Sequence, residues 1–387
     1  MSEPAIVLIT TSFPMANDGS EAAGSFVSDF AEELGKHLSV RVVAPGPQFG
    51  RELWVDNVEV FRYAAPHRPL STLKPWHPLD MFEITRVLRA GMRATHAAVD
   101  AGPTVHMLAL WAFPSGAWAQ RAARKHGIGY SVWILGSDVW SLGRVPVLRS
   151  RLARVIRDAS HAYADGYKLA EDAQHIAKIP VTFLPSTRRI ELADPLPPAL
   201  EPPYRLVFIG RWHPNKGVDL LLDALSLLND DDWRFIGEVT IYGGGPLQSL
   251  VHAKARGLLA AERPLVIGGF IPKADAERAI VRADWVLIPS RIESIPVIFS
   301  DAMKLGRPVV ATPVGDLPVL MRDGCGSLSG AIDALSFAQA LRGALSGCGN
   351  YNPVAVNACA ARFSLEMIGE KLLADVQGRY SHECNVT

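Results

Sequence analysis

The sequence lacks an excess of charge of either sign, and it lacks long hydrophobic runs. Lys and Arg together number 39, as do Asp and Glu, so the formal net charge of the 387 residues is zero. A chain-wide basic surface is therefore excluded, and we expect no nucleic-acid partner. No apolar run reaches the about 18 residues that a membrane-spanning helix needs. The opening residues, MSEPAIVLITTSF, lack a basic segment, which predicts a first strand and not a signal peptide.

The cysteines lack the paired CxxC spacing of a metal site or a redox motif. They are Cys325, Cys348, Cys359 and Cys384. We therefore expect reduced thiols in a cytoplasmic protein, with a zinc site as the alternative.

The glycine fingerprint of dinucleotide-binding proteins is also missing. The loop after the first strand does not read GxGxxG, and the glycine turn YGGGP at 242–246 is followed by Gln248 where a third glycine would be required. A nicotinamide-dependent dehydrogenase is therefore disfavoured.

What the chain does contain is an alternation of apolar runs and amphipathic helices. Ala5–Thr10 predicts a buried parallel strand, Ser25–His37 a helix and Val40–Ala44 a second strand, which together form a Rossmann-like unit. In the connecting loop, Gly24 either lets the backbone approach a phosphate or provides a flexible turn, and both interpretations stay open.

A proline-rich stretch divides the chain. Residues 191–203 predict a linker between an N-terminal domain, 1–190, and a second βα series, 204–365. A terminal helix over 366–387 follows, and one option is that it returns to the N-terminal domain. The predicted fold class is α/β, with two Rossmann-like domains that face each other across a cleft.

The stretch from Ile288 to Ala311 predicts a ligand site. Two short strands flank a helix for which Ser294 is a plausible N-cap, Pro296 suits the first turn and Gly306 is the C′ glycine. The carboxylates Glu293 and Asp301 lie around this helix, at a strand end where open βα folds bind ligands. A helix N-terminus favours phosphate and carboxylates accept hydrogen bonds from hydroxyls, so the stretch indicates a sugar nucleotide.

Two cations open the second βα series. Arg211 ends a strand and Lys216 precedes a helix, so both can reach one cavity and neutralise a diphosphate. The competing interpretation is a pair of solvated loop cations. Consecutive glycines in the 242–246 turn, Gly244 among them, permit close approach of the backbone to a ligand.

Other charged groups allow two interpretations each. Asp138 is either an acceptor-side group or a capping residue. The helix Arg149–Arg157 presents four arginines, which either touch anionic lipid head groups or form a solvated face. The acidic run Asp230–Asp232 is interpreted as solvated, and we expect no metal site.

Several motifs together resemble a known family. GRWHPNKGVDLLLDAL, YGGGP, GGFIPKADAERAI and PSRIESIPVIFSDAMKLGRPVVATPVGDLP are similar to the donor half of retaining GT-B-fold glycosyltransferases of family four. The first half, with SFPMANDGSEAAGSFVSDFAEEL, HMLALWAFPSG and LGSDVW, fits the acceptor half. The resemblance covers about residues 5 to 365.

The resemblance implies roles for matching positions. Arg211 and Lys216 would contact the diphosphate, Glu293 would face the hexose, and Asp301 would bind the ribose hydroxyls. Backbone groups that would approach the donor, and side chains that would line the nucleobase, are those of Gly24, Gly210, Gly244, Gly269, Phe270, Ile271, Ser294, Ile295 and Val297.

Three departures from the family pattern stand out. Asp301 replaces the usual Glu, Pro296 removes a backbone N–H that relatives offer to the ligand, and Leu135 stands where many members carry histidine. For that missing histidine, His106 is either a substitute or a histidine satisfied near the core.

The expected function is transfer of a hexose, with retained configuration, from a nucleotide sugar to a hydroxyl acceptor in polysaccharide or glycolipid synthesis. The donor is expected to be a UDP-sugar, with a GDP-sugar open, and no metal or cofactor is expected beyond this co-substrate. The acceptor would be a glycan or lipid-linked, and the protein cytoplasmic, with peripheral contact at the inner membrane face as an option. The alternatives are a nucleotide-sugar- or glycan-binding relative that acts in assembly and, ranked lower, an epimerase.

Overall fold

The computed structural model describes residues 4–16, 24–66, 70, 73–74, 76–192, 197–348 and 351–383. The predicted phosphate-approaching loop before Gly24 and the predicted linker fall partly outside these ranges, as does Cys384. The chain forms two compact units, one made of Met1–Pro185 with Leu365–Thr387 and the other of Ser186–Ser364. We call them unit 1 and unit 2. The chain passes from unit 1 to unit 2 a few residues before the predicted linker.

Unit 1 is built on an eight-stranded sheet with the order β3-β4-β2-β1-β5-β6-β7-β8. Its strands are parallel except that β3 pairs antiparallel with β4, which gives a hairpin at one edge of the sheet. The strands are β1 (Ala5–Ile9), β2 (Ser39–Gly46), β3 (Gly50–Val55), β4 (Val58–Ala64), β5 (Thr104–Leu110), β6 (Tyr130–Ile134), β7 (Ala162–Ala164) and β8 (Thr182–Phe183).

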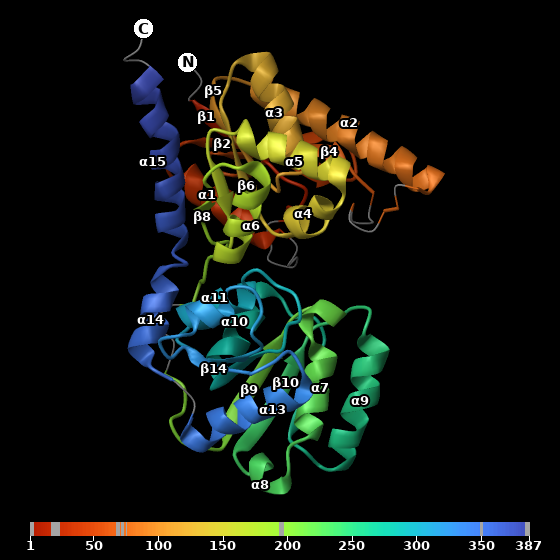
Figure 1. Ribbon diagram of the computed structural model, residues 1–387, viewed down its shortest axis with the longest axis vertical. Helices are drawn as coiled ribbons and strands as arrows, with labels where there is room; N and C mark the ends of the chain where they lie inside the picture. The colour runs from red at the N-terminus through yellow and green to blue at the C-terminus, as the bar shows by residue number, and fades with distance from the viewer. Residues whose placement is uncertain are drawn as a thin grey trace. The chain divides into compact units, whose positions relative to one another are not determined.

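Helices cover both faces of this sheet (Figure 1). They are α1 (Ser25–Gly35), α2 (Pro78–Asp100), α3 (Ser115–His126), α4 (Ser137–Trp140), α5 (Pro146–Arg157), α6 (Tyr167–Ala177) and α15 (Leu365–Glu383). Because side chains alternate along a strand, β1 supplies both cores: Val7 packs with the α2 and α3 side, and Leu8 with the α1 and α15 side.

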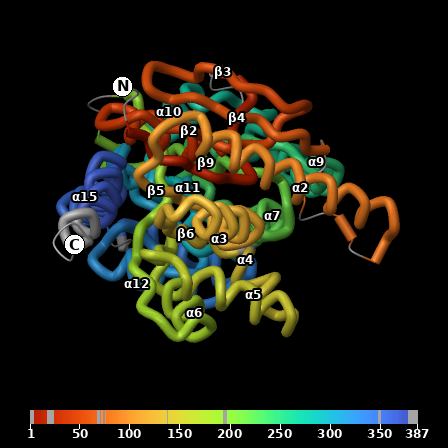
Figure 2. Tube along the Cα trace, turned by 90° about the horizontal axis from the view of Figure 1, so that it is seen from above, coloured from red at the N-terminus to blue at the C-terminus, as the bar shows by residue number. Residues whose placement is uncertain are grey.

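The C-terminal helix belongs to unit 1 although unit 2 precedes it in the chain. Leu372 of α15 is fully buried in the cluster that contains Phe30 of α1. The hydroxyl of Tyr163 in β7 donates a hydrogen bond to the Asp375 carboxylate at 2.8 Å. Figure 2 follows α15, in blue, along unit 1 from a second direction.

Unit 2 contains a parallel six-stranded sheet with the order β11-β10-β9-β12-β13-β14. Its strands are β9 (Tyr204–Ile209), β10 (Ile236–Tyr242), β11 (Leu265–Ile267), β12 (Trp285–Ile288), β13 (Val309–Ala311) and β14 (Gly326–Leu328). Its helices are α7 (Val218–Ser226), α8 (Asp230–Trp233), α9 (Gln248–Ala260), α10 (Lys273–Arg282), α11 (Val297–Lys304), α12 (Leu317–Leu320), α13 (Ala334–Gly343) and α14 (Pro353–Ala361).

The strand order of unit 2 reverses between β9 and β12. From β9 the chain adds β10 and β11 on one side, and it then returns to add β12 on the other. In open parallel sheets such a switch point opens a crevice at the carboxyl ends of the two strands. The loops that follow β9 and β12 are those in which the sequence predicts the site.

The acidic run in unit 2 is not simply solvated, contrary to the interpretation from sequence. Asn229 and Asp232 form a capping box at the start of α8. Asp232 also accepts a hydrogen bond from Arg342 at 2.8 Å, and Asp230 is paired with Arg263. The run caps a helix and ties it to two neighbouring segments.

Candidate functional site

The loops after β9 and β12 meet at the switch point of the unit 2 sheet. Lys216, in the 3-10 turn Pro214–Lys216, forms an ion pair with Glu293 in the loop after β12. The side chains keep 35% and 17% of their surface exposed, so the pair is reachable from solvent. The structure thus brings together the cation and the carboxylate that the sequence singles out.

Arg211 lies in the same loop as Lys216 and points its stem at the glycine turn after β10. A Cβ on Gly245 would lie 3.3 Å from Arg211 Cγ. The Arg211 side chain is exposed, and within the described ranges no carboxylate lies within 4 Å of its guanidinium. One cation of the predicted pair is therefore matched to a carboxylate, and the other is open to an anion.

Two glycines let the loops approach this closely. Gly217 has φ +70°, and a Cβ there would lie 1.8 Å from the carbonyl oxygen of Pro289. Gly315 has φ +51°, and a Cβ there would lie 1.9 Å from the carbonyl oxygen of Ser294. L-residues with a side chain rarely adopt this backbone region, so both positions require glycine on conformational and steric grounds.

Arg291 is a site residue that the sequence reasoning missed. Its guanidinium binds both carboxylate oxygens of Asp219, each at 2.8 Å, and the carbonyl oxygen of Pro214 at 2.8 Å. Burial opposes ionisation of Asp219, but the Arg291 fork outweighs it and lowers the pKa of that carboxyl. Arg291 therefore fixes the loop that carries Lys216. The only sequence signal for Arg291 was its positive charge within the motif PSRIES, because its partner Asp219 is 72 residues away.

The helix after Glu293 starts later than predicted. Ser294 is not its N-cap, because α11 begins at Val297 with Pro296 as the capping residue at φ −62° and ψ 129°. The Ser294 hydroxyl is buried without a hydrogen-bond partner. The predicted C′ glycine is confirmed, since Gly306 has φ +68°.

Asp301 is placed differently from its neighbours in the motif. It is fully buried on α11, and its carboxylate is paired with Arg188, whose side chain is 14% exposed. Lys304, one turn further along α11, donates to the Thr187 hydroxyl and the Arg188 carbonyl. The segment 187–188 thus covers the carboxylate that was predicted to meet ribose, and Asp301 is not exposed to solvent.

The remaining donor-side positions border the glycine turn. Trp212 N–H donates to the Gly244 carbonyl at 2.8 Å, and Gly210 N–H donates to the Tyr242 carbonyl at 3.2 Å. Gly243 N–H donates to the Gly269 carbonyl at 3.0 Å, which fixes the segment before Phe270 and Ile271. Phe270 is 60% exposed, a high value for an aromatic side chain. A flat ligand could stack on it.

The candidate site residues of unit 1, Asp138 and Gly24, make contacts that hold the local fold. Asp138 is buried and accepts hydrogen bonds from Ala112 N–H at 2.7 Å and Val139 N–H at 3.1 Å, which joins the loops after β5 and β6. Burial raises its pKa to about 6. Gly24, with φ +80°, caps α1, and a Cβ there would lie 2.6 Å from Phe13 N.

His106 does not substitute for the missing histidine. It lies near the amino end of β5, is buried, and is hydrogen-bonded to Ser131 at 2.8 Å. Of the two interpretations, the satisfied core histidine is correct. Leu135, at the position where many relatives carry histidine, directly follows β6.

Neither a cluster of metal-ligating side chains nor a membrane-spanning helix occurs in the described part of the chain. Within it, no three His, Cys, Asp or Glu side chains gather in a geometry that could hold a metal ion. None of its helices is long and apolar enough to cross a bilayer.

Comparison with known proteins agrees with this geometry. Residues 203–346 match the family described as glycosyl transferases group 1. The D-inositol 3-phosphate glycosyltransferase of Mycolicibacterium gilvum is 37% identical over 155 residues, which are 39% of this chain and 33% of that protein. The match thus spans about a third of that relative. TuaC of Bacillus subtilis, a glycosyltransferase assigned to teichuronic acid biosynthesis, is 26% identical over 81% of this chain and 82% of its own.

Solved structures share the fold over nearly the whole chain. Sucrose-phosphate synthase from Thermosynechococcus elongatus superposes with a TM-score of 0.74 at 16% identity, covering 98% of this chain and 100% of its own. Anabaena HepE in complex with UDP and glucose gives 0.65 at 15% identity, covering 96% and 99%. The Rossmann-like α/β fold class expected from the sequence is confirmed. The expected resemblance to glycosyltransferases is matched by the family model over residues 203–346.

Proposed function

We propose that this chain, a member of the group 1 glycosyltransferases over residues 203–346, moves a hexose from a nucleotide sugar to a hydroxyl group of an acceptor. The observation that carries the proposal is the contact between Lys216 and Glu293 at the switch point of the unit 2 sheet. A diphosphate oxygen competes for the ammonium of Lys216, and a sugar hydroxyl can donate to the carboxylate of Glu293. When a nucleotide sugar binds, Lys216 is therefore suited to contact its diphosphate and Glu293 its sugar.

The donor diphosphate would bind Arg211 and Lys216, next to the N-terminus of α11. These cations neutralise its charge and the helix end favours it. The hexose would then lie beside Glu293, and the nucleobase near Phe270. A UDP-sugar is favoured, because solved structures of Anabaena HepE, which shares this fold, are complexes with UDP and with UDP-glucose; a GDP-sugar is the alternative.

The transfer would retain the anomeric configuration. The bond between the sugar C1 and the diphosphate oxygen breaks, and the acceptor oxygen forms a bond to C1 on the same face. The acceptor proton passes to the departing diphosphate oxygen. Stabilising that leaving group is the main task of the protein, and Lys216 and Arg211 supply the charge for it without a metal ion or a further cofactor.

The acceptor would be a glycan or a lipid-linked sugar. Two relatives, a D-inositol 3-phosphate glycosyltransferase and a glycosyltransferase assigned to teichuronic acid biosynthesis, support a hydroxyl-rich and anionic acceptor class. Synthesis of such polymers uses nucleotide sugars, and we place the protein in the cytoplasm at the inner face of the membrane.

The test is donor turnover by the purified full chain. UDP-glucose, UDP-galactose, UDP-N-acetylglucosamine and GDP-mannose are incubated separately with the protein, and released nucleotide is measured with and without an added glycan acceptor. The anomeric coupling of the product, from proton NMR, then decides retention. Absence of nucleotide release from every donor at high protein concentration would contradict the proposal.

A second candidate is a relative that binds a nucleotide sugar or glycan without turnover and acts in assembly. The observations that favour it are the burial of Asp301 under Arg188 and the presence of Leu135 in place of histidine. Binding of a nucleotide sugar without hydrolysis or transfer would support this function over catalysis.

A further inference from the structure

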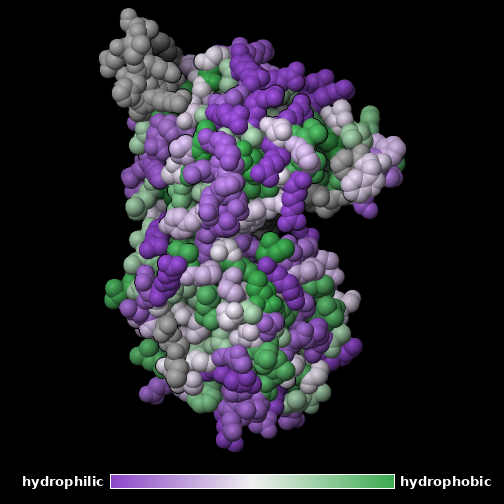
Figure 3. Space-filling view, viewed as in Figure 1, coloured by the Kyte–Doolittle hydropathy of each residue, from purple (hydrophilic) through white to green (hydrophobic). Residues whose placement is uncertain are grey.

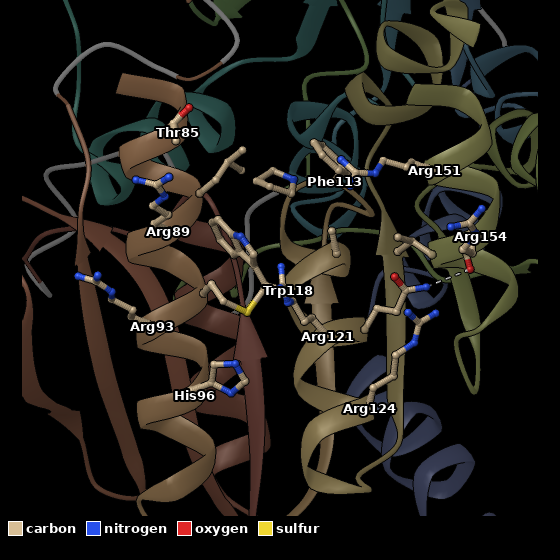
Figure 4. Close-up of a pocket in the computed structure, with 16 residues that line it drawn as sticks. Thr85, Arg89, Arg93, His96, Phe113, Trp118, Arg121, Arg124, Arg151 and Arg154 are labelled. Carbon is tan, nitrogen blue, oxygen red and sulfur yellow. Dashed lines mark hydrogen bonds between the residues drawn. The ribbon is translucent and has the colours of Figure 1, made fainter. Parts of the chain in front are cut away.

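Unit 1 contains a groove that plays no part in the proposed transfer chemistry. It has a volume of about 980 Å³ and runs between α2 on one side and α3 and α5 on the other. Figure 4 shows side chains from all three helices that line it. We call it the arginine groove, because six of its lining residues are arginines. They are Arg89, Arg93, Arg121, Arg124, Arg151 and Arg154.

Most of the positive charge of the arginine groove has no acidic partner among the described residues. None of its sixteen lining residues is acidic. Arg124 is paired with Asp158 at 2.8 Å. For the other five arginines, all exposed, no carboxylate among the described residues comes within 4 Å of the guanidinium. In a chain of zero net charge, this is a local excess that attracts an anion.

Several arginines elsewhere in the chain are paired with carboxylates. Arg51 is paired with Glu59 at 2.6 Å, Arg291 with Asp219 at 2.8 Å, and Arg205 with Asp284 at 3.2 Å. Several unpaired guanidinium groups along one groove repel one another and gain from a shared anionic ligand. A guanidinium fork matches the oxygens of a phosphate in particular.

The floor of the arginine groove is apolar. It includes Leu88 and Met92 from α2, Trp118 from α3 and Val155 from α5. Figure 3 shows hydrophobic side chains between hydrophilic ones over this part of unit 1. A soluble polyanion would gain little from such a floor, whereas a ligand with both a phosphate and a hydrocarbon part would contact both surfaces.

Both walls continue into exposed apolar residues at the helix N-termini. On α2, Met81 and Phe82 precede the lining residues Thr85 and Arg89 at helical spacing, and they are 43% and 66% exposed. On α5, Val147 precedes Arg151 by one turn and is 74% exposed. Large apolar side chains beside basic ones are the pattern of helices that lie at a lipid interface.

We propose that the arginine groove binds the phosphate head groups of an anionic lipid bilayer, with Phe82 and Val147 entering the acyl boundary. The guanidinium groups account for the charge of the ligand, and the apolar floor and helix ends account for its hydrocarbon part. The proposal concerns a surface of unit 1 alone and does not depend on the donor site of unit 2. It widens the membrane contact predicted from the arginines of α5 to a three-helix site.

The test is co-sedimentation of the full chain with vesicles. Phosphatidylcholine vesicles with 30% phosphatidylglycerol are compared with pure phosphatidylcholine at about 0.1 M salt. We expect binding to the anionic vesicles alone. The variant R89Q/R93Q/R121Q should bind about 100-fold more weakly, on the scale of the contribution of each basic residue near an anionic bilayer. F82S/V147S should also weaken binding while leaving the charge unchanged.

The matched control is R256Q/R282Q/R322Q, which removes the same charge from exposed positions of unit 2. It should change vesicle binding by less than about threefold. Equal loss in both triple variants would show non-specific attraction and overturn the proposal, as would failure of the unaltered protein to bind. Full displacement by inorganic phosphate at constant ionic strength would assign the groove to a soluble phosphate ligand instead. Thermal melts establish that each variant is folded, and donor turnover, measured separately without lipid, should be unchanged.

Discussion

Arg188 and Asp301 form an ion pair that joins the first residues of unit 2 to helix α11. The Asp301 carboxylate is fully buried, and the Arg188 side chain is 14% exposed. Because Lys304 holds the same segment through Thr187 and the Arg188 carbonyl, the contact is part of a small network. A buried charge that loses its partner is costly, so this relationship has a measurable consequence.

Arg188→Ala should lower the free energy of unfolding by about 3–5 kcal/mol, since it leaves the Asp301 carboxylate buried without a counter-charge. Urea denaturation measures the change. Arg282→Ala, at an exposed position of α10, is the control and should stay within about 0.5 kcal/mol. The double variant Arg188→Ala/Asp301→Ala should recover part of the loss; simple addition of the two single effects would argue against a coupled pair.

Lys216→Ala should reduce turnover of the preferred donor more than about 100-fold, the scale for loss of one group that stabilises a leaving anion. Initial-rate kinetics of nucleotide release provide the measurement. Lys254→Ala is a matched control. Lys254, on α9, also pairs with a carboxylate, that of Asp223 on α7, but this pair lies outside the proposed donor site. If both variants turned over normally, the assignment of Lys216 would be wrong.

Gly217→Ala should destabilise unit 2 by at least about 2 kcal/mol, because the residue has φ +70° and a Cβ would overlap the Pro289 carbonyl oxygen. Gly257→Ala provides the opposite case. Gly257 lies inside α9 with open space around it, so alanine should stabilise the protein by up to about 1 kcal/mol. Chemical denaturation of both variants tests the pair, and equal effects would contradict the close approach of the two loops.

The pH dependence of stability should carry the signature of Asp138. Burial raises its pKa from 3.8 to about 6, so the folded state binds the proton more tightly than the unfolded state does. Its contribution to stability therefore falls as the pH rises from about 4 to about 6, by an order of 2–3 kcal/mol. The difference in unfolding free energy between the wild type and Asp138→Asn, measured across this range, isolates the effect. A difference that is flat with pH would be inconsistent with a raised pKa.

Turnover should survive removal of divalent cations. Arg211 and Lys216 are proposed to neutralise the diphosphate by themselves, so excess EDTA should leave the rate of donor cleavage within about twofold. An activity that disappears with EDTA and returns with Mg²⁺ would assign part of that charge to a metal ion.

The pattern of apolar residues, glycines and charges along the chain predicted the main strands and helices and the loops that carry Lys216 and Glu293. The apolar run of β1, the αL glycine after α11, and the facing of Lys216 and Glu293 follow from spacing along the chain and from the way a parallel sheet aligns its carboxyl ends. What sequence could not supply were pairings between distant side chains that do not both lie at the carboxyl ends of neighbouring strands.

Two of the missed features depend on such contacts. Arg188 reaches Asp301 over 113 residues of chain, and Arg291 reaches Asp219 over 72. The start of α11 was predicted too early because Ser294 has the preferred cap chemistry, whereas the backbone of Pro296 is what separates the loop from the helix. The arginines of α5 were recognised, but a groove that three helices share cannot be read from one of them.

The return of α15 to unit 1 has a consequence for biosynthesis. Because Leu372 completes the packing around α1 and Asp375 accepts the hydrogen bond from Tyr163, the amino-terminal sheet emerges from the ribosome without one of its covering helices. The nascent chain must keep that apolar face shielded while all of Ser186–Ser364 is translated, whereas the intervening segment is contiguous and can fold as soon as it is released. The packing of unit 1 is therefore completed only after α15 has been synthesised, whereas unit 2 needs no later segment.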